Sequence, residues 1–213
     1  MRAINWRRAA GIAAVAAPLL MWADFLGVGL TRSGYNLLTR PFSDLATMGT
    51  QNSTVFDVGF FLVPGLLTVV IGLGLLDTRG MGRLWNAGAA LVIGAGAFLF
   101  LTGVFRQDPS VPSAGVLHGT VSQICFALAS IAPALLFIGS AGLRTSAPPR
   151  RVWLVVAVAA LALELFGVLV RPALHIPYGL FQRPFTLALT VFFVTTSFWL
   201  LRDRRLRGLS VQD

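Results

Sequence analysis

The chain has 213 residues, of which 56% are hydrophobic and only 12% are charged, and its mean hydropathy is +0.78. A soluble domain carries about 25% charged residues, so this composition does not suit a water-facing surface. It also excludes a disordered chain and a disulfide scaffold. The net charge of +9 comes from seventeen basic residues, all arginine, against eight acids. We therefore expect one integral membrane domain over residues 1–213.

Six stretches are long and apolar enough to cross a bilayer. A span needs about 20 apolar residues to cross a hydrocarbon core of roughly 30 Å, and its backbone must satisfy its own hydrogen bonds there. The first run is too long for the core of a signal peptide, so we expect it to remain as a span. The expected spans are residues 9–30, 56–76, 85–105, 116–139, 152–170 and 184–201. This pattern predicts an all-α bundle of six transmembrane helices.

The distribution of arginine predicts how the bundle is oriented. Twelve arginines lie in the N-terminal segment, the second and fourth connections and the C-terminal tail, and five lie on the other side. Because positive residues are retained in the cytoplasm, we expect both termini to be cytoplasmic, in a bacterial-type plasma membrane. The first, third and fifth connections then face outward. The basic tail from Arg202 to Arg207 is expected to lie against anionic lipid of the inner leaflet.

The polar residues that suggest chemistry gather on the outward side. Both histidines of the chain are there, together with arginines, acids and a serine. In chain order these residues are Arg40, Ser43, Asp44, Asp57, Arg106, Asp108, His118, Arg171, His175 and Arg183. Any reaction or binding event would therefore be expected at this face.

Three motifs on this side resemble a known family. They are Pro41-Phe42-Ser43-Asp44-Leu45 followed by Asn52 and Phe56, Gly103-Val104-Phe105-Arg106-Gln107-Asp108 followed by His118, and Gly179-Leu180-Phe181-Gln182-Arg183. In order and spacing they resemble the bacterial and archaeal multi-spanning membrane family called domain of unknown function 998. The resemblance covers nearly the whole chain. It implies a membrane location and marks Ser43, Asp44, Asp108 and His118 as candidate catalytic residues, but it brings no established activity. The family has a Glu-Arg pair where this chain has Gln182-Arg183, which weakens any role for a carboxylate there.

Two kinds of chemistry would use these residues. A hydroxyl, a carboxylate and an imidazole on one membrane face can form a nucleophile with its base. Alternatively, Asp44 or Asp108 with His118 and His175 would form a zinc site of two histidines and one carboxylate. We favour the first interpretation, which needs no cofactor, over zinc.

The same residues also fit a structural role, which we favour over catalysis. Ser43 and Asp44 are good N-cap residues, so they can start a short interfacial helix. His118, near the start of its span, can hydrogen-bond a loop carbonyl. The arginines can extend towards lipid headgroups or pair with Asp44, Asp57 and Asp108. These arginines are Arg40, Arg106 and Arg183.

Two further acids lie inside the spans. Asp24 and Glu164 are each six residues before the outward end of their span, which is about 9 Å deep at 1.5 Å per residue. An acid at that depth costs about 2.5 kcal/mol or more and is a functional candidate. The two acids either line one outward-open cavity or bridge helices in protonated form. Glu164 is also two helical turns before Arg171, so an ion pair between them is a further alternative.

The segments Tyr35–Ser43 and Tyr178–Thr186 share Tyr, Leu, Arg, Pro and Phe at identical offsets. Either chance or a parallel repeat of the kind found in transporters explains this similarity. If it is a repeat, Arg40 and Arg183 flank one outward vestibule that suits lipid headgroups or phosphate. Together with Arg106 and Glu164, they are our candidate substrate-binding residues.

Three functions remain open for this chain, whose biochemical activity the sequence does not assign. We favour a protein that binds membrane lipids or a membrane partner, which includes a second copy of the chain. The first alternative is a hydrolase or transferase that acts on lipid-type substrates at the outer leaflet. The second is a small proton-coupled transporter that uses Asp24 and Glu164. Nucleic acid is not an expected partner, because the chain has no nucleic-acid motif.

Overall fold

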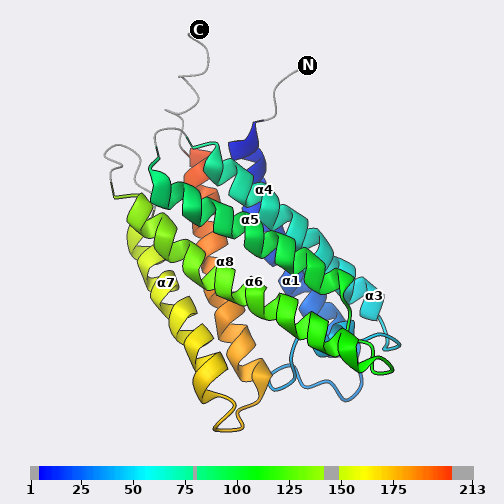
Figure 1. The fold of residues 1–213 in the computed structure, drawn as a ribbon. Helices are drawn as coiled ribbons and strands as arrows, with labels where there is room; N and C mark the ends of the chain where they lie inside the picture. The colour runs from blue at the N-terminus through cyan, green and yellow to red at the C-terminus, as the bar shows by residue number, and fades with distance from the viewer. Residues whose placement is uncertain (1–4, 79–80, 142–148, 203–213) are drawn as a thin grey trace.

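The computed structural model describes residues 5–78, 81–141 and 149–202. Within these ranges it is helical, with no strand. Six of its helices are long and apolar enough to cross a membrane (Figure 1). The expected all-α fold with six spans is thereby confirmed.

Some of the six spans are composite helices. The first is α1 (Trp6–Thr31), and the second runs without a break through α3 (Ser53–Phe56), the π-helix η1 (Asp57–Leu62) and α4 (Val63–Leu76). The third and fourth are α5 (Arg83–Val104) and α6 (Pro112–Gly139). The fifth is α7 (Arg150–Leu165) continued by the π-helix η2 (Phe166–Val170), and the last is α8 (Tyr178–Arg202). A short helix, α2 (Ser43–Ala46), lies in the first connection.

Two helices begin several residues before the expected apolar spans. The fourth span begins at Pro112 rather than at residue 116, and the last begins at Tyr178 rather than at residue 184. The apolar run of the last span begins only after Gln182 and Arg183, but the helix extends back through these two polar residues. Its first turn is held from outside, because the Gly179 N–H donates to the Thr39 carbonyl over 3.0 Å. This tertiary contact allows α8 to begin before its apolar run.

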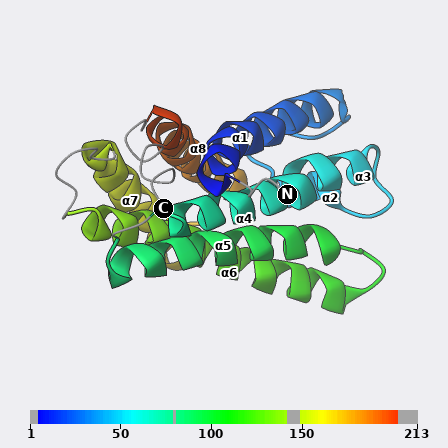
Figure 2. The same ribbon diagram turned by 90° about the horizontal axis from the view of Figure 1, so that it is seen from above.

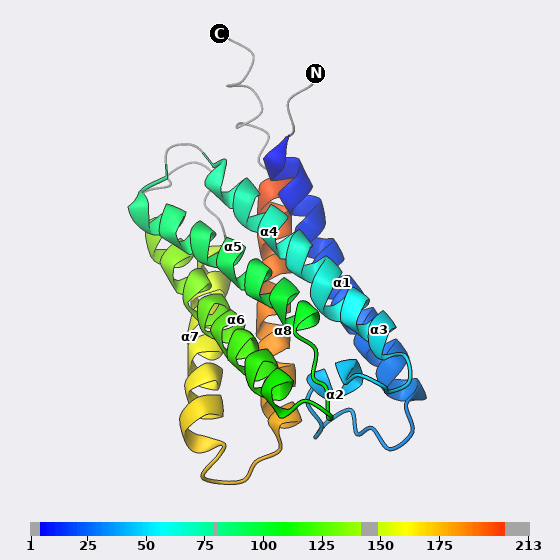
Figure 3. The ribbon, with the colours of Figure 1, turned by 45° about the vertical axis from the view of Figure 1, so that its right-hand side comes forward.

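The six spans form a closed ring. Each packs mainly against its neighbours in chain order, and α8 returns to pack against α1 (Figure 2). Because the number of spans is even, α1 begins and α8 ends at the same end, which we call the terminal end. The opposite end holds α2 and the connections 32–52, 105–111 and 171–177, and we call it the loop end (Figure 3).

The arginines are sorted between these two ends as the sequence predicts. At the terminal end are Arg7, Arg8, Arg83, Arg150, Arg151 and Arg202, and towards the loop end are Arg32, Arg40, Arg106, Arg171 and Arg183. The arginines at positions 2, 79, 144, 204, 205 and 207 lie outside the described residues. That the terminal end faces the cytoplasm stays a prediction.

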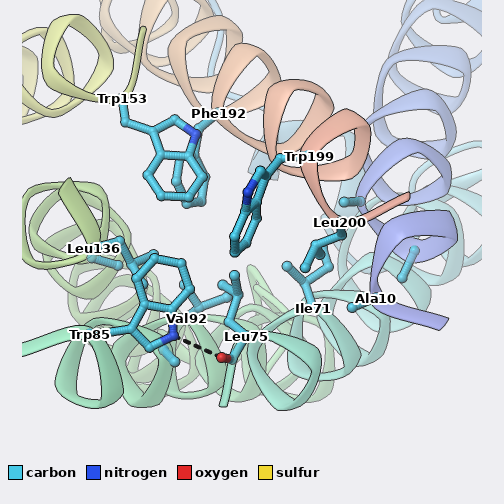
Figure 4. Packing of buried hydrophobic residues seen from close by; sticks show 14 of the residues in the cluster. Ala10, Ile71, Leu75, Trp85, Val92, Leu136, Trp153, Phe192, Trp199 and Leu200 are labelled. Carbon is cyan, nitrogen blue, oxygen red and sulfur yellow. Dashed lines mark hydrogen bonds between the residues drawn. The ribbon is translucent and has the colours of Figure 1, made fainter. Parts of the chain in front are cut away.

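A cluster of indoles fills the ring near its terminal end (Figure 4). The ring centroids of Trp85, Trp153 and Trp199, from α5, α7 and α8, are 5.5 to 5.9 Å apart. Trp85 is fully buried, and its Nε1 donates to the Leu75 carbonyl over 2.8 Å. This bond satisfies the only polar atom of the Trp85 side chain, as burial requires. The cluster therefore ties three spans together near the terminal end.

Glycines allow the spans to approach closely. A Cβ atom added to Gly65 of α4 would lie 2.6 Å from the backbone nitrogen of Phe100 in α5. Small residues commonly give such backbone contacts in membranes, where lipid supplies no hydrophobic drive for helix association. The outer faces instead carry large apolar side chains, such as Leu19, Ile131 and Val155. Such faces suit lipid, so the ring has a tightly packed inside and an apolar outside.

Candidate functional site

A cavity of about 370 Å³ lies within the ring. It is lined by side chains from α1, η1, α4, α5, α6 and α8 and by the connections 32–52 and 105–111. Its volume falls within the range of about 300–1,000 Å³ typical of small-molecule sites. The cavity is thus large enough to bind a ligand.

The polar side chains of the cavity concentrate towards the loop end, within about three turns of the start of α6. They are Ser43, Gln107, His118, Ser122, Gln123, Tyr178 and Gln182. None of the described residues that line the cavity is an arginine, aspartate or glutamate. This part of the lining, which we call the polar end, is therefore rich in hydrogen-bonding groups that carry no formal charge, with His118 as its one imidazole.

The lining farther from the loop end is mostly apolar. Its threonines do not change this, because several of them satisfy their hydroxyl groups within their own helix. Thr68 donates to the Pro64 carbonyl and Thr190 to the Thr186 carbonyl, over 2.8 and 2.9 Å. Phenylalanine, leucine and alanine side chains supply most of the remaining surface. The cavity therefore combines a polar end with an apolar interior.

Ser43 reaches the polar end from α2. Its Oγ accepts a hydrogen bond from Gln107 Nε2 over 3.5 Å, and Gln107 Oε1 accepts one from Thr47 over 3.5 Å. The expected short helix is present, but Ser43 and Asp44 do not cap it. The N-cap position is Phe42, and no side chain makes a capping bond. Ser43 is instead the first residue of the helix, with its hydroxyl directed to Gln107.

His118 lies at the polar end with 2% of its surface exposed. Its Nδ1 is 2.9 Å from the carbonyl oxygen of Phe105, the residue at the C-cap of α5. This contact is the structural role predicted for His118, a bond to a loop carbonyl. Ser43 and His118 line the same cavity, although no hydrogen bond links their side chains.

The two candidate aspartates lie outside the cavity lining. Asp44 forms a partly exposed ion pair with Arg40 at 3.6 Å. Asp108 accepts hydrogen bonds from the Ser110 hydroxyl over 2.6 Å and from the Ser110 N–H over 2.9 Å, and these bonds lower the pKa of its carboxyl. The four predicted catalytic residues are therefore divided: Ser43 and His118 line the cavity, and the two acids lie elsewhere.

The predicted zinc ligands do not gather in the described part of the chain. No group of three or more His, Cys, Asp or Glu side chains there is arranged to hold a metal ion. His175 is exposed in the connection 171–177, with a φ of 53°, whereas His118 is buried. The described residues thus offer no support for the two-histidine site.

Arg106 and Arg183 have structural partners near the cavity. Arg106 pairs with Asp57 at 3.4 Å, as the structural interpretation predicted. Arg183 forms no ion pair within 4 Å among the described residues: it donates to the Tyr35 hydroxyl over 2.9 Å, and its guanidinium stacks on the rings of Phe25 and Phe42. Burial raises the pKa of Tyr35, and Arg183 partly opposes that shift. Both arginines help to hold the first connection in place.

The two similar segments differ in structure and touch each other. Residues 35–42 are non-helical, whereas Tyr178–Thr186 lies wholly in α8. The Gly179 N–H donates to Thr39, and the Phe42 N–H donates to Gln182 Oε1 over 2.9 Å. The segments are therefore partners in one contact and do not form a structural repeat. Neither Arg40 nor Arg183 is among the residues that line the cavity.

The two acids within the spans do not line the cavity either. Asp24 packs against Gly59 of η1, so close that a Cβ on that glycine would lie 2.8 Å from the carboxyl carbon. Glu164, only 8% exposed, accepts a hydrogen bond from Gln123 of α6, which does line the cavity. Of the predicted alternatives, Glu164 therefore fits a bridge between helices. The predicted partner Arg171 instead stacks on the ring of Tyr178 at 4.5 Å.

Comparison with known families adds one result. The family described as "Protein of unknown function (DUF998)" matches residues 15–199. The chain belongs to DUF998. No curated protein and no solved structure gives a match. The region that matches DUF998 contains every residue that lines the cavity. Membership confirms the resemblance identified from the sequence, and DUF998 itself has no assigned activity.

In α6, sequence reasoning identified His118 but not the residues of this DUF998 site that follow it. Ser122 and Gln123 line the cavity one turn beyond His118 and Gly119, and Phe126 follows on the same side. Residues three and four apart share one face of a helix. Polar residues at this spacing in an otherwise apolar span are the sequence signal for these positions, and neither residue is charged or a common metal ligand.

Proposed function

We propose that the protein binds an amphipathic, lipid-type ligand inside its ring of helices. The polar head of the ligand lies at the polar end, and its apolar chain extends towards the indole cluster. The observation that carries this proposal is the division of one cavity into an uncharged polar end and an apolar interior. A ligand with the same division matches both parts of the lining. We place this activity in the plasma membrane, where such ligands are abundant.

A hydrolase or transferase acting on lipid-type substrates is the second candidate. Its support is that Ser43 and His118, a potential nucleophile and base, line the same cavity. Binding is preferred because Asp44 and Asp108, the acids that would complete such a set, lie outside the lining. Proton-coupled transport has less support, since Asp24 and Glu164 are both outside the lining as well.

Photolabelling of the purified protein tests the proposed binding. We expect hexadecanol with a diazirine in its chain to label peptides of α6 and α8 that line the cavity, and unlabelled hexadecanol to compete. The variant Ala129→Phe fills part of the cavity and should reduce this labelling. The matched control is Ile131→Phe, which adds bulk at an exposed position of the same helix and should leave labelling intact. Labelling confined to lipid-facing residues, without competition, would refute the proposal.

A further inference from the structure

Gln182 of α8 is held in one orientation at the polar end. Its Oε1 accepts the 2.9 Å hydrogen bond from the Phe42 N–H, and the side chain is 5% exposed. A glutamine amide has one acceptor oxygen and one donor nitrogen. Because a backbone N–H can only donate, the oxygen must face Phe42. Gln182 therefore has its Nε2 hydrogens left to offer to a ligand.

Gln123 of α6 is held in the opposite sense. Its Nε2 donates to Glu164 Oε1, and Glu164 is buried behind it. Because the Glu164 oxygen accepts this hydrogen bond, the nitrogen of Gln123 faces Glu164. Its Oε1 is then left for a ligand. The cavity is thus lined by one amide that offers a donor and another that offers an acceptor.

We infer that the head of the ligand is an uncharged group that both donates and accepts hydrogen bonds, namely a hydroxyl or an amide. This inference rests on the proposed function and specifies the ligand class for the same cavity. Glu164 acts as a positioning residue: it does not line the cavity, but it fixes which atom Gln123 presents. Gln182 and Gln123 together determine the specificity.

Charged heads fit this lining poorly. A phosphate or carboxylate only accepts, so it cannot satisfy the oxygen of Gln123, and an ammonium only donates, so it cannot satisfy Gln182 Nε2. Neither would meet an opposite charge on the described lining, which contains no arginine for an anion and no aspartate or glutamate for an ammonium. Burying a charge without a partner is costly, and a site built for hydrogen bonds discriminates strongly against heads that leave its groups unpaired.

Competition against the diazirine probe at neutral pH tests the inference. The competitors share one sixteen-carbon alkyl chain and differ only in the head group: hexadecanol, hexadecanamide, hexadecylamine and hexadecanoate. We expect the alcohol and the amide to compete about tenfold or more better than the amine and the carboxylate, which corresponds to the loss of one or more hydrogen bonds. Similar competition by all four would overturn the inference while leaving binding intact. No competition by any of them would refute the proposed function itself.

Two variants test the residues, with thermal unfolding as the check that each one folds. In Gln182→Glu the carboxylate still accepts the hydrogen bond from the Phe42 N–H but no longer offers a donor to the ligand. We therefore expect hexadecylamine to compete better than hexadecanol, the reverse of the order expected for the unchanged protein. In Glu164→Gln the new amide can bond Gln123 in either orientation, so the advantage of the alcohol should shrink to within about threefold. Asp24→Asn is the matched control, because it neutralises an acid outside the lining and should change nothing. A wild-type preference for the amine that Glu164→Gln abolishes would instead make Glu164 a counter-ion and overturn the inference.

Discussion

Replacing Arg106 with alanine tests how the connection 105–111 is held to the second span. The guanidinium is 3.4 Å from Asp57 Oδ2 and donates to Ser53 Oγ over 2.8 Å and to the Ala46 carbonyl. The Asp57 side chain is only 6% exposed and that of Arg106 21%. Because the substitution leaves a buried acid without its cation, we expect the free energy of unfolding to fall by about 3–5 kcal/mol.

A double-mutant cycle separates the ion pair from the other hydrogen bonds. In an Asp57→Asn background, Arg106→Ala removes the hydrogen bonds to Ser53, Thr54 and Ala46, which together contribute about 1–2 kcal/mol. The coupling between Arg106 and Asp57 should therefore be about 2–3 kcal/mol. This coupling energy, rather than the cost of the single variant, measures the free energy that the buried ion pair contributes.

Unfolding in mixed micelles, titrated with SDS and followed by tryptophan fluorescence, measures these free energies. Arg40→Ala is the matched control, because the Arg40 side chain is 57% exposed in its ion pair with Asp44. Its cost should be at most about 1 kcal/mol, as for other exposed pairs. The reasoning is refuted if Arg106→Ala costs less than about 1 kcal/mol, or if its cost is the same with Asp57 and with Asn at that position.

Three further changes have expected outcomes. Gly65→Ala should lower the free energy of unfolding by about 1–3 kcal/mol, because its Cβ would meet the backbone of α5. Gly27→Ala is the control in the same titration: open space surrounds Gly27, so this variant should be neutral or slightly stabilising. Trp85→Phe should cost about 1–3 kcal/mol, because it removes the hydrogen bond to the Leu75 carbonyl and leaves a smaller ring at a fully buried position; an unchanged unfolding curve would contradict this. Ser110→Ala should raise the pKa of Asp108 towards the ordinary aspartate value, as measured by carbon NMR of the carboxyl. Because hydrogen bonds to Ser110 lower this pKa, their stabilising effect should be present above the unfolded-state pKa and disappear as pH falls through the folded-state pKa.

The number and type of the elements could be predicted because the bilayer restricts the chain so strongly. Each apolar run had to be a helix of sufficient length, and the runs were separated by polar connections. The start of α8 at Tyr178 could not be predicted in this way, because it depends on a contact with Thr39, far away in the sequence. The π-helices η1 and η2 were also missed, since no residue pattern used in the sequence reasoning distinguishes them from α-helix.

The candidate site was predicted in part. Motifs in the outward connections directed attention to Ser43 and His118, and both line the cavity. Asp44 and Asp108 stood in the same motifs, but short-range partners hold them on the surface. Gln123 was missed because its importance depends on Glu164 of a neighbouring helix. The motifs thus predicted at which end of the bundle the site lies. Which of their side chains line the cavity could be seen only in the folded structure.

The indole cluster has a consequence for exchange of material between the two sides of the membrane. Trp85, Trp153 and Trp199 pack against one another at the terminal end, so a molecule leaving the cavity in that direction would meet three packed indoles. Passage through the ring would require three packed indoles to separate and the Trp85 hydrogen bond to break. A bound molecule is therefore expected to enter and leave without crossing the indole cluster, so that its residence time should not depend on separation of the three indoles.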